Sequence, residues 1–91
     1  MEKIDVSKLS WKIYRWMLEE HYLPGEQLTI FAFIYEYSGN DEISNYDVIK
    51  QLFVKPSFTE VKLEAVINLL LIKDLIVASV YGQTITYRIK K

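Results

Sequence analysis

Residues 76–89, IVASVYGQTITYRI, decide the fold. β-branched and aromatic residues flank Gly82-Gln83, and a two-residue loop that begins with glycine is typical of a type II′ β-hairpin. The pairs expected from this turn are Tyr81–Thr84, Val80–Ile85, Ser79–Thr86, Ala78–Tyr87, Val77–Arg88 and Ile76–Ile89. One face of the hairpin is then apolar and the other mostly polar, and a shift of one residue would destroy that separation. The sequence therefore predicts an antiparallel hairpin with one register.

Two helices are expected immediately upstream. Ser57-Phe58-Thr59-Glu60 has the pattern of a capping box, which predicts a helix from there to about Asp74. The apolar set of this helix includes Val61, Ala65, Leu69 and Ile72, joined by Val66 and Leu70, while Glu60, Glu64 and Asn68 lie along an outward line. Pro56 separates it from a shorter helix over Ser44 to about Leu52, in which Ser44 and Asp47 resemble a capping box.

The N-terminal half predicts two more helices. Glu26 to Tyr37 is apolar on most sides and ends at a Ser-Gly-Asn-Asp turn. Ser7 to Tyr22 reads as a first helix capped by Ser7 or Ser10, and Pro24-Gly25 ends it. Its apolar surface is wider than its own core needs, so it is expected to contact a second copy of the chain. The candidate dimer residues are Leu9, Trp11, Ile13, Trp16 and Met17.

Composition limits the class of protein. The chain has 91 residues, which suits a single domain, and 51% of them are hydrophobic, which allows a packed core. It has no cysteine, no basic start followed by an apolar run, and no apolar stretch near the roughly 20 residues that span a bilayer. We therefore expect a cytoplasmic protein with no membrane contact.

The net charge of −1 is unevenly distributed. Residues 1–18 sum to +2, residues 19–47 to −7 and residues 48–91 to +4. A chain polarised in this way can present a positive face to phosphate, although chance clustering on solvated faces is the alternative.

The order of these elements resembles a winged helix-turn-helix. The segment from Leu69 to Val77, with Tyr81-Gly82-Gln83 and 86–89 after it, is similar to the end of the recognition helix and the wing of bacterial regulators of the MarR type. Residues 25–38 resemble the first core helix of winged-helix domains in phage and plasmid replication initiators. The resemblance covers about residues 25–90, and it implies an α+β, mostly helical fold with a C-terminal wing. Residues 1–24 would be an added N-terminal helix, and Ile43 a minimal edge strand.

The resemblance implies a DNA-binding transcription regulator or replication accessory, and the wide apolar surface of the N-terminal helix adds the expectation that it is a dimer. The N-terminal half of the fourth helix would enter the major groove of duplex DNA and the wing would touch the backbone or minor groove. The candidate DNA contacts are Lys50, Lys55, Ser57, Thr59, Lys62, Gln83, Thr84 and Arg88. Two features depart from the usual pattern: Glu60 and Glu64 would face the DNA, and the wing tip, residues 81–84, has no Lys or Arg.

The alternative is a winged-helix module, such as an inhibitor or adaptor, that binds protein and not DNA. Its acidic face would comprise Glu19, Glu20, Asp41, Glu42 and Asp47. A phage or mobile-element protein would suit either function.

Enzymatic chemistry is not expected, and neither is a cofactor. His21 is the single histidine, so a metal site would lack ligands, and Glu60 with Glu64 is too small a set for a hard cation. The aromatic residues could line a ligand pocket, but at helical spacing they more often form the core or a dimer interface. This set comprises Trp11, Tyr14, Trp16, Tyr22, Phe31, Phe33, Tyr35 and Tyr37.

Overall fold

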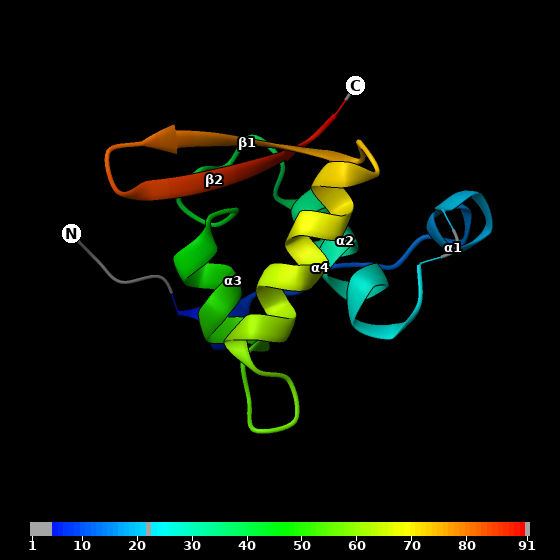
Figure 1. The fold of residues 1–91 in the computed structure, drawn as a ribbon, viewed down its shortest axis with the longest axis horizontal. Coiled ribbons are helices and arrows are strands. Elements are labelled where there is room, and N and C mark those ends of the chain that lie inside the picture. The colour runs from blue at the N-terminus through cyan, green and yellow to red at the C-terminus, as the bar shows by residue number, and fades with distance from the viewer. Residues whose placement is uncertain (1–4, 22, 91) are drawn as a thin grey trace.

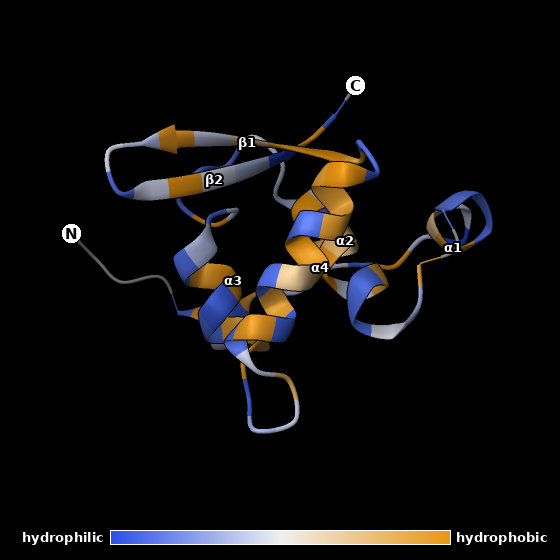
Figure 2. Cartoon of the chain, in the orientation of Figure 1, coloured by the Kyte–Doolittle hydropathy of each residue, from blue (hydrophilic) through white to orange (hydrophobic). Residues whose placement is uncertain are grey.

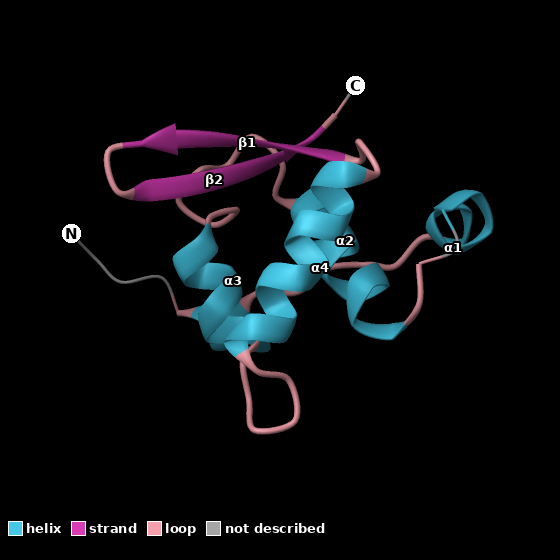
Figure 3. Cartoon of the chain, viewed as in Figure 1, coloured by secondary structure: helices cyan, strands magenta, loops and turns pink. Residues whose placement is uncertain are grey.

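The computed structural model describes residues 5–21 and 23–90 (Figure 1). A 3-10 turn at Val6–Lys8 precedes α1 (Arg15–His21), α2 (Gly25–Glu36), α3 (Tyr46–Phe53), α4 (Glu60–Ile72), β1 (Ile76–Tyr81) and β2 (Thr84–Ile89). The described part of the chain is a small α+β fold of four α-helices and one antiparallel hairpin. Figure 3 shows the hairpin lying across one end of the helical layer, while the link between α3 and α4 lies at the other end.

The hairpin has the predicted register at every position. Its six pairs run from Tyr81–Thr84 to Ile76–Ile89. Gly82 has a φ of 63°, and Gln83 is not among the residues with positive φ, which is the type II′ pattern. Only the base of the apolar face is buried, at Ile76 and Tyr87, because the tip extends past the helices.

A third segment pairs with β2, two residues away from the expected position. Asn45, and not Ile43, forms a single antiparallel bridge with Thr86. Ser44 adds two hydrogen bonds to β2 beside this bridge. Its carbonyl accepts from the Tyr87 N–H at 2.9 Å, and its hydroxyl donates to the Tyr87 carbonyl at 2.7 Å. This connection positions the start of α3 against the hairpin.

The two C-terminal helices form where expected, but their caps differ. The α3 cap is Asn45, whose side chain accepts from the Val48 N–H, so the Ser44–Asp47 capping box is wrong. The α4 cap is Thr59, which accepts from the Lys62 N–H, so the capping box at Ser57 is also wrong. In both cases the cap is the residue directly before the helix, because only there does the side chain reach the free N–H groups of the first turn.

The first predicted helix is largely absent. Residues 9–14 form neither a helix nor a strand, and only Arg15–His21 is α-helical; the predicted end at Tyr22 lies outside the described residues. Trp11 packs edge-on against Phe33 and Phe53, with ring centroids 5.0 and 5.6 Å apart. The Tyr37 hydroxyl donates to the Ser10 carbonyl at 2.6 Å and accepts from the Ser10 N–H. Tertiary contacts therefore outweigh helix formation in this segment.

The core is built around α2, whose residues from Ile30 to Ile34 are all buried. α4 faces it with Leu63, Ile67 and Leu70. Of the apolar set predicted for α4, Leu70 is buried and Val66 packs against the core, while the positions given for Val61 and Ile72 are wrong. Val61 and Ile72 lie on the outside instead. Figure 2 shows hydrophobic residues along the length of α4, which explains why periodicity did not identify the buried side.

None of the helices in the described ranges is long and apolar enough to cross a bilayer.

Candidate functional site

The N-terminal end of α4 is held by a tight turn. The backbone groups of Lys55 and Phe58 are bonded in both directions, at 3.0 and 2.9 Å, and the Phe58 ring is buried. The residues around it that were predicted to contact DNA are all exposed: Lys55, Ser57, Thr59 and Lys62. The turn thus anchors one aromatic ring and presents two ammonium groups and two hydroxyls to solvent.

The other predicted DNA contacts are placed differently. Lys50 is ion-paired with Glu60, at 3.4 Å. Gln83 is exposed and Thr84 half-buried at the hairpin tip, and the Arg88 guanidinium donates to the Ser79 hydroxyl at 3.2 Å. Because the hairpin and the α3–α4 link lie at opposite ends of the helical layer, these residues do not form one compact cluster.

Glu60 is held by two neighbours on α3. Its Oε2 accepts from the Tyr46 hydroxyl at 2.8 Å, and its Oε1 faces the Lys50 ammonium. The hydrogen bond from Tyr46 and the charge of Lys50 lower the pKa of Glu60. Glu60 therefore contacts α3 while its side chain stays 43% exposed, and it lines the same groove as the exposed Glu64 and Asn68.

A groove of about 300 Å³ lies between α4 and β2. It is lined by Tyr46, Glu60, Glu64, Ile67, Asn68, Ile85 and Tyr87. Burial, and then the carboxylate of Glu64, raises the pKa of Tyr87, and burial followed by the bond to Glu60 raises that of Tyr46. The groove is thus acidic, with phenol groups that stay protonated. Sequence reasoning missed both tyrosines, because the bridge from Asn45 to β2 brings them together.

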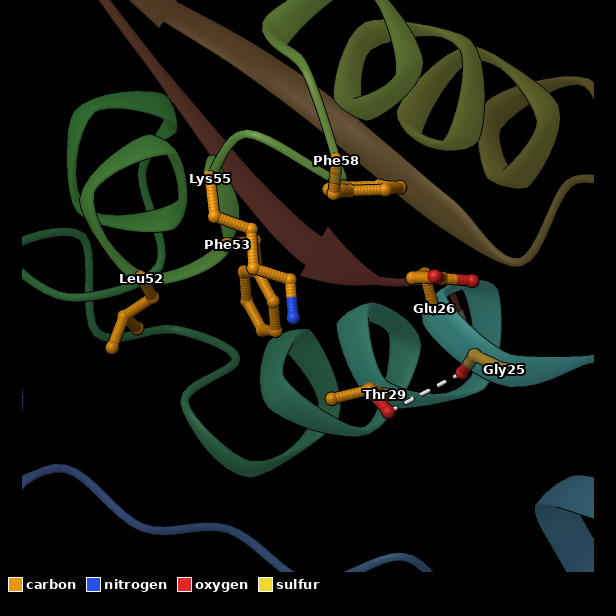
Figure 4. A pocket seen from close by; sticks show the side chains of 7 residues that line it. All are labelled: Gly25, Glu26, Thr29, Leu52, Phe53, Lys55 and Phe58. Atoms are coloured by element: carbon orange, nitrogen blue, oxygen red, sulfur yellow. Dashed lines mark hydrogen bonds between the residues drawn. The ribbon is translucent and has the colours of Figure 1, made fainter.

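A second cleft, of about 420 Å³, lies on the other side of the α3–α4 link (Figure 4). Leu52, Phe53 and Phe58 form its apolar wall, and Gly25, Glu26 and Thr29 of α2 close it. Figure 4 shows the Lys55 side chain turned towards α2. The ammonium of Lys55 therefore borders this cleft.

Large apolar side chains are exposed on α4 and on the hairpin. Val61 and Ile72 on α4 are 76% and 81% exposed, and Val80 on β1 is 68% exposed. Val80 is paired with Ile85, which is also exposed and lines the groove, so exposed apolar side chains adjoin the groove on the hairpin. Adjoining apolar side chains on a surface are typical of interaction sites.

The predicted dimer residues are split between the core and the surface. Met17 is fully buried, and Leu9 and Trp11 pack against the core, so the expectation that these three face a second copy is wrong. Trp16 is half-buried against Phe31 and Tyr35. Ile13 alone of the five is exposed. The exposed apolar residues of this region are named here the α1 patch: Ile13, Tyr14, Leu18 and Tyr35.

The predicted aromatic set behaves mainly as core. Phe31 and Phe33 are buried, and Trp11, Trp16 and Tyr37 pack against them, while Tyr22 lies outside the described residues.

The predicted acidic residues do not share one surface. Glu19 and Glu20 lie on α1, at one end of the long axis, whereas Asp47 lies on α3 and Asp41 and Glu42 follow α2 (Figure 1).

No group of three or more His, Asp or Glu side chains in residues 5–21 and 23–90 could hold a metal ion.

No protein-family model, curated protein or solved structure matches the chain.

Proposed function

We propose that the chain is a non-enzymatic winged helix-turn-helix protein that binds duplex DNA as a dimer, in transcription control or as a replication accessory. The arrangement of α3, the α3–α4 link and α4, followed by a hairpin, is consistent with that fold. The single bridge between Asn45 and Thr86 lies where that fold has a short third strand, which supports the proposal.

The observation that carries the DNA proposal is the exposed end of α4. A recognition helix meets base edges and phosphates with its first turns. Lys62 lies in the first turn of α4, and the exposed Lys55, Ser57 and Thr59 come directly before that helix. Lys50 and Tyr46 hold the charge of Glu60, which reduces its repulsion of phosphate. Glu64 still opposes the approach of DNA, since no hydrogen bond or ion pair within the described residues engages it.

The test is a duplex titration over a salt series, with random duplex and DNA from the chain's own genomic neighbourhood. Binding should weaken steeply with salt. Lys55→Ala with Lys62→Ala should weaken binding to all sequences and reduce the salt slope by about 2, because two phosphate contacts are removed. The matched control is Lys8→Ala with Lys12→Ala, which removes the same charge from the N-terminal segment. Equal affinity of the Lys55/Lys62 variant and the wild type would reject this contact surface.

The second candidate is a protein-interaction module. The exposed Val61, Ile72 and Val80 favour it, because DNA-reading surfaces are polar and cationic whereas protein interfaces bury apolar side chains. No retention on duplex at about 50 mM salt, where electrostatic binding is strong, would leave this candidate standing alone.

A further inference from the structure

We infer that the groove between α4 and β2 binds an arginine side chain presented by a protein partner. This site is independent of DNA binding. Two carboxylates, those of Glu60 and Glu64, line the groove. Both oxygens of Glu60 are engaged, one by Tyr46 and the other by Lys50. Glu64 is exposed and has no such partner in residues 5–21 and 23–90. The groove therefore offers one carboxylate that is free to bind a cation.

Tyr87 is the second feature that points to a ligand. The residue is only 4% exposed, yet its hydroxyl has no hydrogen-bond partner within the described residues. Every fully buried side-chain oxygen or nitrogen of the described residues has a hydrogen-bond partner. Because the Tyr87 hydroxyl has none, its oxygen is not fully enclosed, and it opens into the groove that Tyr87 lines. Two hydrogen bonds fix the backbone of Tyr87: its N–H donates to the Ser44 carbonyl, and its carbonyl accepts from the Ser44 hydroxyl. A rigid phenol oxygen thus stands beside the free carboxylate, ready to accept a hydrogen bond.

The shape and chemistry of the groove favour a guanidinium group. Its walls include the apolar side chains of Ile67 and Ile85, and its polar groups are the Glu64 carboxylate, the Tyr87 hydroxyl and the Asn68 amide. A guanidinium is flat, weakly hydrated and carries its donors in one plane, so it can place its faces against the apolar walls while it donates to the oxygens. An ammonium group is compact and strongly hydrated, and gains less from such walls.

The surroundings of the groove indicate that a protein supplies the arginine. Val80 is exposed on the hairpin, and Val61 on α4. Arginine beside apolar side chains is a typical centre of a protein interface, where both are desolvated together. A partner that inserts an arginine here would cover that apolar surface as well.

The test uses N-acetyl-arginine amide as the probe, and the isosteric but uncharged N-acetyl-citrulline amide as the control ligand. NMR titration of the full chain should show saturable shifts at Glu64, Ile85 and Tyr87 with the arginine probe, with a Kd on the order of millimolar because the ligand is small. Citrulline should cause no saturable shift. Glu64→Gln should weaken binding at least about 5-fold, because it removes the charge but keeps the shape. Tyr87→Phe should weaken it about 3-fold.

Glu42→Gln, on an exposed turn, is the matched charge control and should bind the probe as the wild type does. Equal binding of citrulline, or unchanged binding in Glu64→Gln, would overturn the inference. Failure of the DNA proposal is separable, because phosphate and guanidinium make opposite demands on Glu64. The Glu64→Gln variant should bind duplex more tightly and the arginine probe more weakly.

Discussion

At the scale of single residues, the ionisation of Tyr46 and Tyr87 links the groove to the stability of the fold. Both pKa values are raised above the ordinary 10.0. In the unfolded chain the two phenols lose their protons near pH 10, while in the folded chain they keep them. Their contribution to stability is therefore complete below pH 10 and is lost as the pH rises above it.

We expect the free energy of unfolding to fall between about pH 9 and about pH 11, and to fall less in a Tyr46→Phe, Tyr87→Phe double variant. Urea unfolding at each pH measures this. Tyr81→Phe, at the exposed hairpin tip, is the control and should retain the decline of the wild type. A double variant that declines as steeply as the wild type would contradict the prediction.

At the scale of elements, α4 is capped by Thr59 and not by Ser57, the cap that the sequence predicts. Thr59 accepts from the Lys62 N–H, at 3.4 Å, whereas Ser57 lies in the turn before it. Thr59→Ala should destabilise the fold by about 0.5–1 kcal/mol, because the helix loses its cap. Ser57→Ala should change stability by less than about 0.5 kcal/mol, as other exposed substitutions do. Urea unfolding of the pair decides the matter, and a larger cost at Ser57 would restore the capping box.

The sequence predicts some of the helices and strands and not others. The hairpin register was predictable because turn chemistry and alternation are both local, and α2 begins and ends within one residue of its predicted bounds. The absence of a helix over residues 9–14 was not predictable, since Trp11 there contacts rings that are distant in the sequence. The groove depends on the pairing of β2 with Asn45, so Tyr46 and Tyr87 meet only in the folded chain. Local sequence patterns therefore predict individual helices and strands, whereas the groove is formed by contacts between residues that are distant in the sequence.

At the scale of the whole molecule, the α1 patch tests the proposed dimer. α1 lies at one end of the long axis, where Ile13 and Leu18 are 51% and 53% exposed. Arg15 and Glu19 are paired at 3.0 Å along α1. In an antiparallel two-fold contact, Arg15 of each copy would also face Glu19 of the other, so the patch is self-complementary in charge as well as apolar.

Leu18→Glu should therefore convert a dimer into a monomer at tens of micromolar, because it places two carboxylates at the two-fold contact. Leu18 suits this test better than Trp16, whose ring packs against Phe31 and whose loss would disturb the fold. Sedimentation velocity measures the mass, and circular dichroism checks that the variant is folded. Ile72→Glu places the same charge on an equally apolar, exposed site of α4 and should remain dimeric. A wild-type monomer at this concentration would mean that the α1 patch does not join two copies, and that each copy would meet DNA through a single α4.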